Sequence, residues 1–262
     1  MIEWLKKILE ATAWEMEVPP AWGVLHVSFL VIGLAVAVTA AYALRNADEK
    51  TNRRIILSVG VYLAIAEVYK QLLHILVIDT DGYHWGEFPF QFCSAPLYLC
   101  LIIPFLRDGK LKDAMYDCLM SFNFMGGLTA FFEPSGLLHE YWTTTFHSLI
   151  WHMLLVFLGL YIGFSRRGGR SVAGFRHALY VFLSLSALAF TLNLILWVPS
   201  GGEINLFFLG PAPSTIIVFD WISETFGWYV NLPIFLGSVA LGSFILYYPF
   251  VLWNKKRGGA QS

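Results

Sequence analysis

The chain has 262 residues, of which 57% are hydrophobic and only 13% are charged. This composition leaves too little polar surface to cover a water-soluble globule, so it predicts a polytopic membrane protein. The net charge of −1 gives no electrostatic basis for binding nucleic acid.

The hydrophobic pattern predicts an all-α fold. Residues 1–20 alternate apolar and charged side chains and end at two prolines, which is typical of a short amphipathic helix on the bilayer surface. Apolar runs of roughly the 20 residues that cross a bilayer follow. They cover residues 22–44, 55–78, 88–106, 113–132, 143–165, 175–199 and 227–252. We therefore expect a seven-transmembrane-helix bundle over residues 21–254 and a basic tail over 255–262.

The basic residues indicate how this bundle is oriented. Of the 17 Lys and Arg residues, all except Lys6, Lys7 and Lys70 lie around the connectors after the first, third and fifth runs or after the last run. Connectors rich in Lys and Arg stay in the cytoplasm. The N-terminus is therefore expected outside, and the C-terminal tail in the cytoplasm.

The third run, FPFQFCSAPLYLC, carries more polar and proline residues than a membrane span needs. Pro96 has no N–H to donate to the carbonyl of Phe92, so we expect a kinked or loosened helix beside Cys93. A thiol beside freed backbone is a candidate reaction centre. The alternative is that cysteine and proline are simply tolerated here, as in many membrane helices.

A second polar group lies in the second run. Glu67, Lys70 and His74 are spaced three and four residues apart, so they share one face of a helix. A lysine inside a membrane needs an anion, and Glu67 is the evident partner. The pair is either a structural ion pair that locks helices together or a functional one. In the second case Lys70 attracts a lipid phosphate or helps to hold Cys93 as a thiolate.

Two histidines enter the membrane in the fifth run, at depths of about 6 and 13 Å that bracket the depth of Cys93 at about 8 Å. His147 and His152 are five residues apart, or about 140° around a helix, so both cannot point at one atom. Either is a buried packing residue or a base that activates the thiol. The amides of Gln91, Asn123 and Asn193 are candidate donors to an oxyanion.

The sequence predicts no cofactor. Cys93, Cys100 and Cys118 have no metal-ligand spacing and imply no disulfide framework, so no metal is expected. The chain also contains neither a phosphate-binding loop nor a dinucleotide fingerprint.

Three segments together resemble the YwaF-like family of bacterial integral membrane proteins. They are QFC at residues 91–93, FHSLIWH at 146–152, and NLFFLGPAPSTIIVFDWISETFGWYV from Asn205. That family is similar to the eukaryotic transmembrane protein 164 family, whose members are phospholipid acyltransferases with a membrane-embedded cysteine as acyl carrier. The resemblance implies that Cys93 is the nucleophile and that His147 or His152 is the base. It also implies a phospholipid or lysophospholipid substrate and a multi-pass location in the bacterial plasma membrane.

The leading hypothesis is a lipid acyltransferase or transacylase that forms an acyl thioester in a pocket near the outer leaflet. Glu67, Lys70, His74, Gln91, Asn123 and Asn193 are expected to bind substrate or support the site. One alternative is a transporter or receptor that recognises its ligand in an outward-facing polar cavity. Another is a scaffold whose polar layer only specifies helix packing.

Overall fold

The computed structural model describes residues 2–214 and 216–259, and these residues form helices and no strand. A short bridge between Glu15 and Tyr141 joins the segment after the first helix to the start of α7. The helices are α1 (Ile2–Glu10), α2 (Val24–Ala43), α3 (Glu49–Leu73), α4 (Ala95–Ile102), α5 (Lys110–Cys118), α6 (Phe124–Phe132), α7 (Trp142–Phe164), α8 (Val172–Leu196), α9 (Ile217–Phe226) and α10 (Trp228–Gly259).

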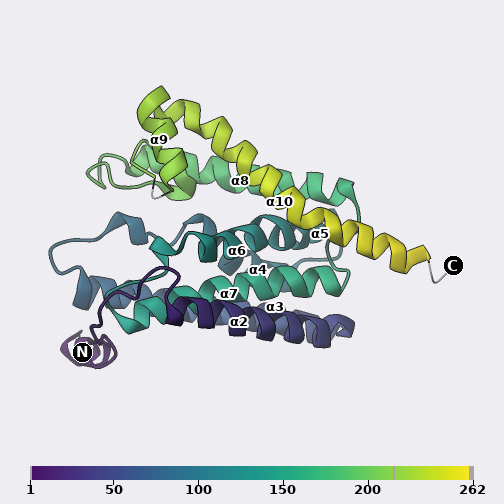
Figure 1. Cartoon of the computed structure of the whole chain (residues 1–262), viewed down its shortest axis with the longest axis horizontal. Helices are drawn as coiled ribbons and strands as arrows, with labels where there is room; N and C mark the ends of the chain where they lie inside the picture. The colour runs from purple at the N-terminus through teal and green to yellow at the C-terminus, as the bar shows by residue number, and fades with distance from the viewer. Residues whose placement is uncertain (1, 215, 260–262) are drawn as a thin grey trace.

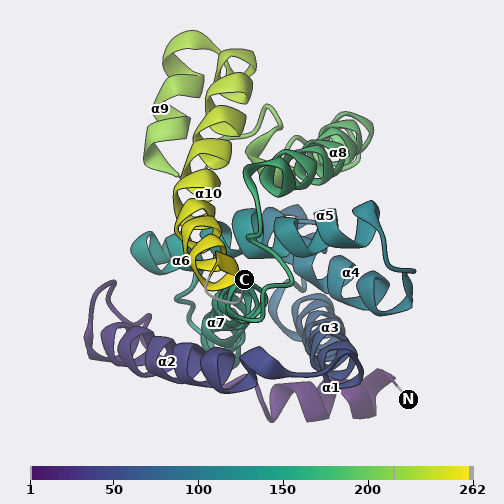
Figure 2. The same cartoon turned by 90° about the vertical axis from the view of Figure 1, so that its right-hand side faces the viewer.

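The long helices run side by side as a bundle, with α2, α3 and α7 on one side and α8 and α10 on the other (Figure 1). The segment from α4 to α6 lies between these two groups. Helix α1 lies across one end of the bundle, below α3 in the view along the bundle axis (Figure 2). The C-terminal end of α10 lies at the opposite end, so the two termini of the described chain are far apart along the bundle axis.

Six helical segments are long and apolar enough to cross a membrane, and they match six of the seven predicted runs. They are Val24–Asn46, Glu49–Ile78, Trp85–Phe105, Trp142–Phe164, Val172–Leu196 and Trp228–Lys256. The remaining run corresponds to α5 and α6, which a buried π-helical turn (η6, Leu119–Asn123) joins into one helical segment. This segment is not among the six candidate spans, and a seventh crossing stays a prediction.

The third run, predicted as a helix kinked or loosened beside Cys93, is not α-helical before Ala95. The chain is extended at Gln91, forms a 3₁₀ turn (η4, Phe92–Ser94) and becomes α-helical only at Ala95. Pro96 therefore lies in the first turn of α4, where a backbone N–H has no intrahelical acceptor in any case. The proline does not kink a helix beside Cys93, because the helix starts there.

The two ends of the chain and one connector also differ from expectation. Helix α1 ends at Glu10, well before the prolines that the sequence favoured as its end. The connector predicted over residues 200–226 contains α9. The predicted tail from residue 255 continues α10 as far as Gly259, and residues 260–262 lie outside the described residues.

Buried polar contacts hold the helices in register. Asn52 of α3 donates from Nδ2 to the Tyr116 hydroxyl (2.8 Å) and accepts at Oδ1 from the Tyr161 hydroxyl (3.0 Å). This amide thus connects α3, α5 and α7 with both of its polar atoms satisfied, which is what a fully buried amide requires. The basic connectors meet at this same end, where Glu49 of α3 pairs with Lys112 and Arg167.

Gly159 sets how closely α7 approaches the start of α6, and we predict that Gly159→Ala destabilises the protein. An added Cβ would lie 2.4 Å from Cβ of Phe124, so the helices would have to separate. Overpacking of this kind costs about 1–3 kcal/mol, measured as a lower unfolding midpoint in detergent. Gly237→Ala in α10 is the matched control, because a Cβ there meets no atom within 4 Å. Equal effects of the two substitutions would contradict the close packing.

Candidate active site

A charged cluster lies at the C-terminal end of α3. Lys70 Nζ lies 3.2 Å from Glu67 Oε1 and 3.2 Å from Glu87 Oε2, so one ammonium group faces two carboxylates. Glu67 is 6% exposed, and such a buried carboxylate requires a cation or hydrogen-bond donors. The ion pair predicted between Glu67 and Lys70 is therefore present, with a second carboxylate from the connector.

The connector that follows α3 folds back onto this cluster. Gln71 Nε2 donates to Glu67 Oε1 (2.8 Å) and to the backbone carbonyl of Glu87 (2.5 Å). The Tyr83 hydroxyl donates to Gln71 Oε1 (3.0 Å), and Gln91 Nε2 donates to the carbonyl of Gly86 (3.0 Å). These bonds fix the irregular segment that leads from α3 to the cysteine-bearing turn.

Cys93 lies in that turn, half-buried and with a free thiol. Its backbone carbonyl accepts a hydrogen bond from the indole Nε1 of Trp151 in α7 (2.8 Å). The rings of Phe90 and Phe92 pack against Phe207 on the opposite side of the bundle. The turn is thus held between α7 and the segment before α9.

The two histidines of α7 have different surroundings. The His147 ring packs against Trp151, with 5.3 Å between centroids, and its Nε2 is buried without a hydrogen-bond partner among the described residues. His152 Nδ1 lies 2.8 Å from the carbonyl of Ser148. A carbonyl only accepts, so Nδ1 carries the hydrogen and Nε2 of the neutral ring keeps its lone pair.

Trp151 is the direct link between the proposed catalytic residues. It lies on α7 between His147 and His152, its indole donates to the Cys93 carbonyl, and its ring packs against His147. The part of the chain that the structure describes contains no hydrogen bond between the Cys93 thiol and either imidazole. A polar layer shared by α3, η4 and α7 therefore stays a prediction.

The other predicted site residues lie on different elements. His74 Nδ1 pairs with Asp79 Oδ2 (2.9 Å) at the start of the connector. Asn123 is the last residue of the π-helical turn and is 2% exposed, and its Oδ1 has no hydrogen-bond partner among the described residues. Asn193 binds the backbone of Leu206 from both ends of its amide, at 3.0 and 2.8 Å. Asn193 therefore anchors the loop before α9, a structural use of a residue predicted to support the site.

Sequence reasoning missed Glu87, Trp151 and His139. Glu87 stands one residue before the predicted third span and therefore looked like a connector residue. Trp151 is one of 10 tryptophans, and nothing in the sequence marks its contact with Cys93. His139 Nε2 lies 3.3 Å from the hydroxyl of Ser148, a residue of α7 like His147 and His152. Burial lowers the pKa of His139, and the Glu87 carboxylate partly opposes that shift.

The hydrogen bond from Trp151 gives a test of how Cys93 is positioned. Trp151→Phe keeps an aromatic ring for His147 but removes the N–H that binds the Cys93 carbonyl. We expect reaction at Cys93 to slow by about fivefold, the equivalent of one hydrogen bond of about 1 kcal/mol. Labelling of the protein by an acyl donor measures this rate. Trp142→Phe is the matched control, because Trp142 Nε1 has no partner among the described residues. An equally large fall in the labelling rate of Trp142→Phe would show that the hydrogen bond from Trp151 does not cause the effect.

The apolar helices and the buried polar side chains among them define a class, the multi-pass helical membrane protein. Among the described residues, no group of three or more metal-ligating side chains occurs. A family model matches residues 19–248, and the chain belongs to the TMEM164 family. All the residues of the proposed site fall within the match. Comparison with curated proteins and with solved structures gave no significant match. The predicted relation to the transmembrane protein 164 family is thus confirmed. The bacterial YwaF-like assignment stays a prediction.

Proposed function

We propose that the protein is a phospholipid acyltransferase with Cys93 as the acyl carrier. The observation that carries the proposal is the hydrogen bond from Trp151 Nε1 to the Cys93 carbonyl (2.8 Å), because it holds Cys93 beside α7, the helix that carries both histidines. Burial alone disfavours a thiolate, so a neighbouring imidazole that takes the thiol proton would supply the effective nucleophile. Family membership supports the same activity, because it is the one that the resemblance implies.

The reaction consists of two acyl transfers. In the first, the sulfur of Cys93 attacks the carbonyl carbon of a phospholipid ester, and the bond from that carbon to the glycerol oxygen breaks. The thiol proton passes through a histidine to the departing oxygen, which gives a lysophospholipid and an acyl thioester. In the second, the hydroxyl group of an acceptor lipid attacks the thioester. The carbon–sulfur bond then breaks, and the acceptor's proton returns to the sulfur.

The local contacts favour particular roles in these steps. His152 is the better candidate base, because its bond to Ser148 leaves Nε2 free to accept a proton. Gln91 is the best placed of the three amides to stabilise the oxyanion. It belongs to the same turn as Cys93 and uses one of its two amide hydrogens on Gly86.

Purified protein supplied with a phospholipid labelled in its acyl chain and with an unlabelled lysophospholipid tests the proposal. The expected result is label on the acceptor lipid, with a transient protein-bound label that hydroxylamine removes. Saturable lipid binding with neither acyl transfer nor a protein-bound acyl group would contradict the enzymatic proposal and favour the transporter or receptor alternative.

We further propose seven crossings, with the N-terminus outside and the C-terminus in the cytoplasm of a bacterial cell. The segment α5–η6–α6 supports this count. Its start pairs with the basic end through Arg170 and Asp113 (2.7 Å), and its end packs Phe131 against His26 at the start of α2. Tags at the two termini should react with an impermeant reagent from opposite faces of sealed vesicles. Labelling of both tags from one face would contradict seven crossings.

A further inference from the structure

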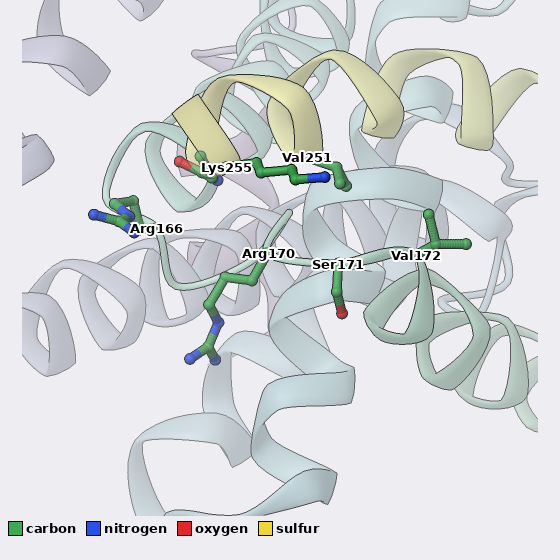
Figure 3. Close-up of a pocket in the computed structure, with 7 residues that line it drawn as sticks. Arg166, Arg170, Ser171, Val172, Val251 and Lys255 are labelled. Atoms are coloured by element: carbon green, nitrogen blue, oxygen red, sulfur yellow. The ribbon is translucent and has the colours of Figure 1, made fainter. Parts of the chain in front are cut away.

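A groove of about 450 Å³ opens at the basic end of the bundle, far along α7 from the candidate active site. It lies between the loop that joins α7 to α8 and the last turns of α10 (Figure 3). The residues that line it are Arg166, Arg170, Ser171, Val172, Val251, Asn254 and Lys255. His147 and His152 belong to the first half of α7, whereas the groove begins just after that helix ends.

The loop that forms one wall of the groove is held in place by buried side chains. Asp117 Oδ1 accepts hydrogen bonds from the Gly169 backbone N–H (2.8 Å) and from the Tyr247 hydroxyl (2.9 Å). Asn254 Nδ2 donates to the carbonyl of Gly169 (3.0 Å). Arg166 has a φ of 60°, a conformation that the fixed loop imposes on a non-glycine residue. The groove is therefore a defined feature of the fold.

The basic residues around the groove are not all neutralised. Arg167 pairs with Glu49, and Arg170 pairs with Asp113 at 2.7 Å. Arg166 and Lys255, in contrast, have no carboxylate partner in the portion of the chain that the structure describes. Positive charge at the cytoplasmic end of a membrane helix is common, and topology alone accounts for it. Here, however, two unpaired cations line one concave surface.

Two further features of the groove favour a phosphate group with an apolar attachment. Helix α8 starts at Val172, so its first backbone N–H groups and the positive end of its dipole lie at the groove. Val172 is 52% exposed and Val251 forms part of the floor, so the lining also offers apolar contact. Val172 and Val251 belong to the ends of two candidate membrane spans, where the glycerol and upper acyl region of a bound lipid would meet its headgroup.

From these observations we propose that the groove binds the phosphate of an anionic glycerophospholipid in the leaflet at the basic end. Arg166 and Lys255 bind the phosphate oxygens, the start of α8 adds backbone donors, and the two valines contact the lipid below its headgroup. Basic recesses between membrane helices are suited to such headgroups because charge attraction and apolar contact act together. The site is independent of the proposed acyl transfer.

The test compares lipid binding by variants that remove equal charge. Labelled phosphatidylglycerol and labelled phosphatidylcholine are titrated into the full-length protein in neutral detergent. The groove variant is Arg166→Asn with Lys255→Gln, since asparagine tolerates the left-handed conformation at position 166. The control variant is Lys50→Gln with Arg54→Gln, which removes two exposed positive charges from the same end of the bundle but outside the groove.

We expect the groove variant to bind phosphatidylglycerol at least about tenfold more weakly, and the control to bind it as the wild type does. Phosphatidylcholine should bind more weakly than phosphatidylglycerol to the wild type. Equal losses of affinity for phosphatidylglycerol in the two variants would overturn the proposal, because the effect would then come from the total charge and not from the groove. Competition by millimolar inorganic phosphate would overturn the lipid assignment in favour of a free anion. If the double variant does not fold, the two single substitutions are measured, and unchanged affinity in both contradicts the site.

Discussion

Cys93→Ala is expected to abolish acyl transfer and the hydroxylamine-sensitive acyl adduct together. Removing a covalent nucleophile takes away the route through the thioester, and in well-studied enzymes this costs a factor of about 10³ or more in turnover. The substitution removes one sulfur from a half-buried turn whose backbone is held by Trp151, so the fold should persist. The measurement is the initial rate of labelled acyl transfer by detergent-purified protein.

The other two cysteines are controls for this substitution. Cys100 and Cys118 are both buried in the helical core, at 0% and 1% exposure. Cys100→Ala and Cys118→Ala should lower stability slightly through lost packing but retain transfer. Transfer that survives Cys93→Ala and fails in either control would place the chemistry elsewhere in the protein.

Lys70→Met should have the largest effect on stability among the site variants. Glu67 and Glu87 share the Lys70 ammonium at 3.2 Å each, so its loss leaves two carboxylates without their cation in a poorly solvated region. Removing one partner of a buried ion pair costs about 3–5 kcal/mol, because the remaining charge is no longer compensated. The measurement is the free energy of unfolding in mixed micelles. Acyl transfer should also fall, since Lys70 binds Glu87 of the connector that leads to Cys93.

Two further variants separate charge compensation from lost packing. Lys70→Met combined with Glu67→Gln and Glu87→Gln removes the unpaired charges and should recover most of the stability without recovering transfer. Lys112→Met is the comparison at a lysine with exposed partners, because Lys112 pairs with Glu49 and Asp108, whose side chains are 56% and 91% exposed. Such a pair is worth at most about 1 kcal/mol. A Lys70 variant no less stable than the Lys112 variant would contradict the importance of the cluster.

Hydropathy and charge alone predicted much of the fold. A long apolar run needs an internally hydrogen-bonded backbone in lipid, so runs such as residues 143–165 could be assigned to helices without tertiary information. The pair of Glu67 and Lys70 was predictable for a related reason, because a lysine within an apolar run needs a nearby anion. The convergence of the basic connectors at one end likewise follows from their alternation along the chain.

The missed features depend on contacts between segments far apart in sequence. The start of α4 at Ala95 could not be told from a kinked helix, because proline is compatible both with a kink and with the first turn of a helix. The contact of Trp151 with Cys93 joins residues 58 positions apart and leaves no periodic signal. Asn193 looked like a polar site residue, but it binds the backbone of Leu206. Composition cannot distinguish these two uses of a buried amide.

The most direct test of the proposed chemistry is to locate the acyl group on the protein. After brief incubation with a phospholipid donor, the protein is digested and its peptides are analysed by mass spectrometry with and without hydroxylamine. Our account predicts a hydroxylamine-sensitive acyl group on the peptide that contains Cys93 and none on Cys100 or Cys118. Acylation of another residue, or active transfer with Cys93 never modified, would contradict it.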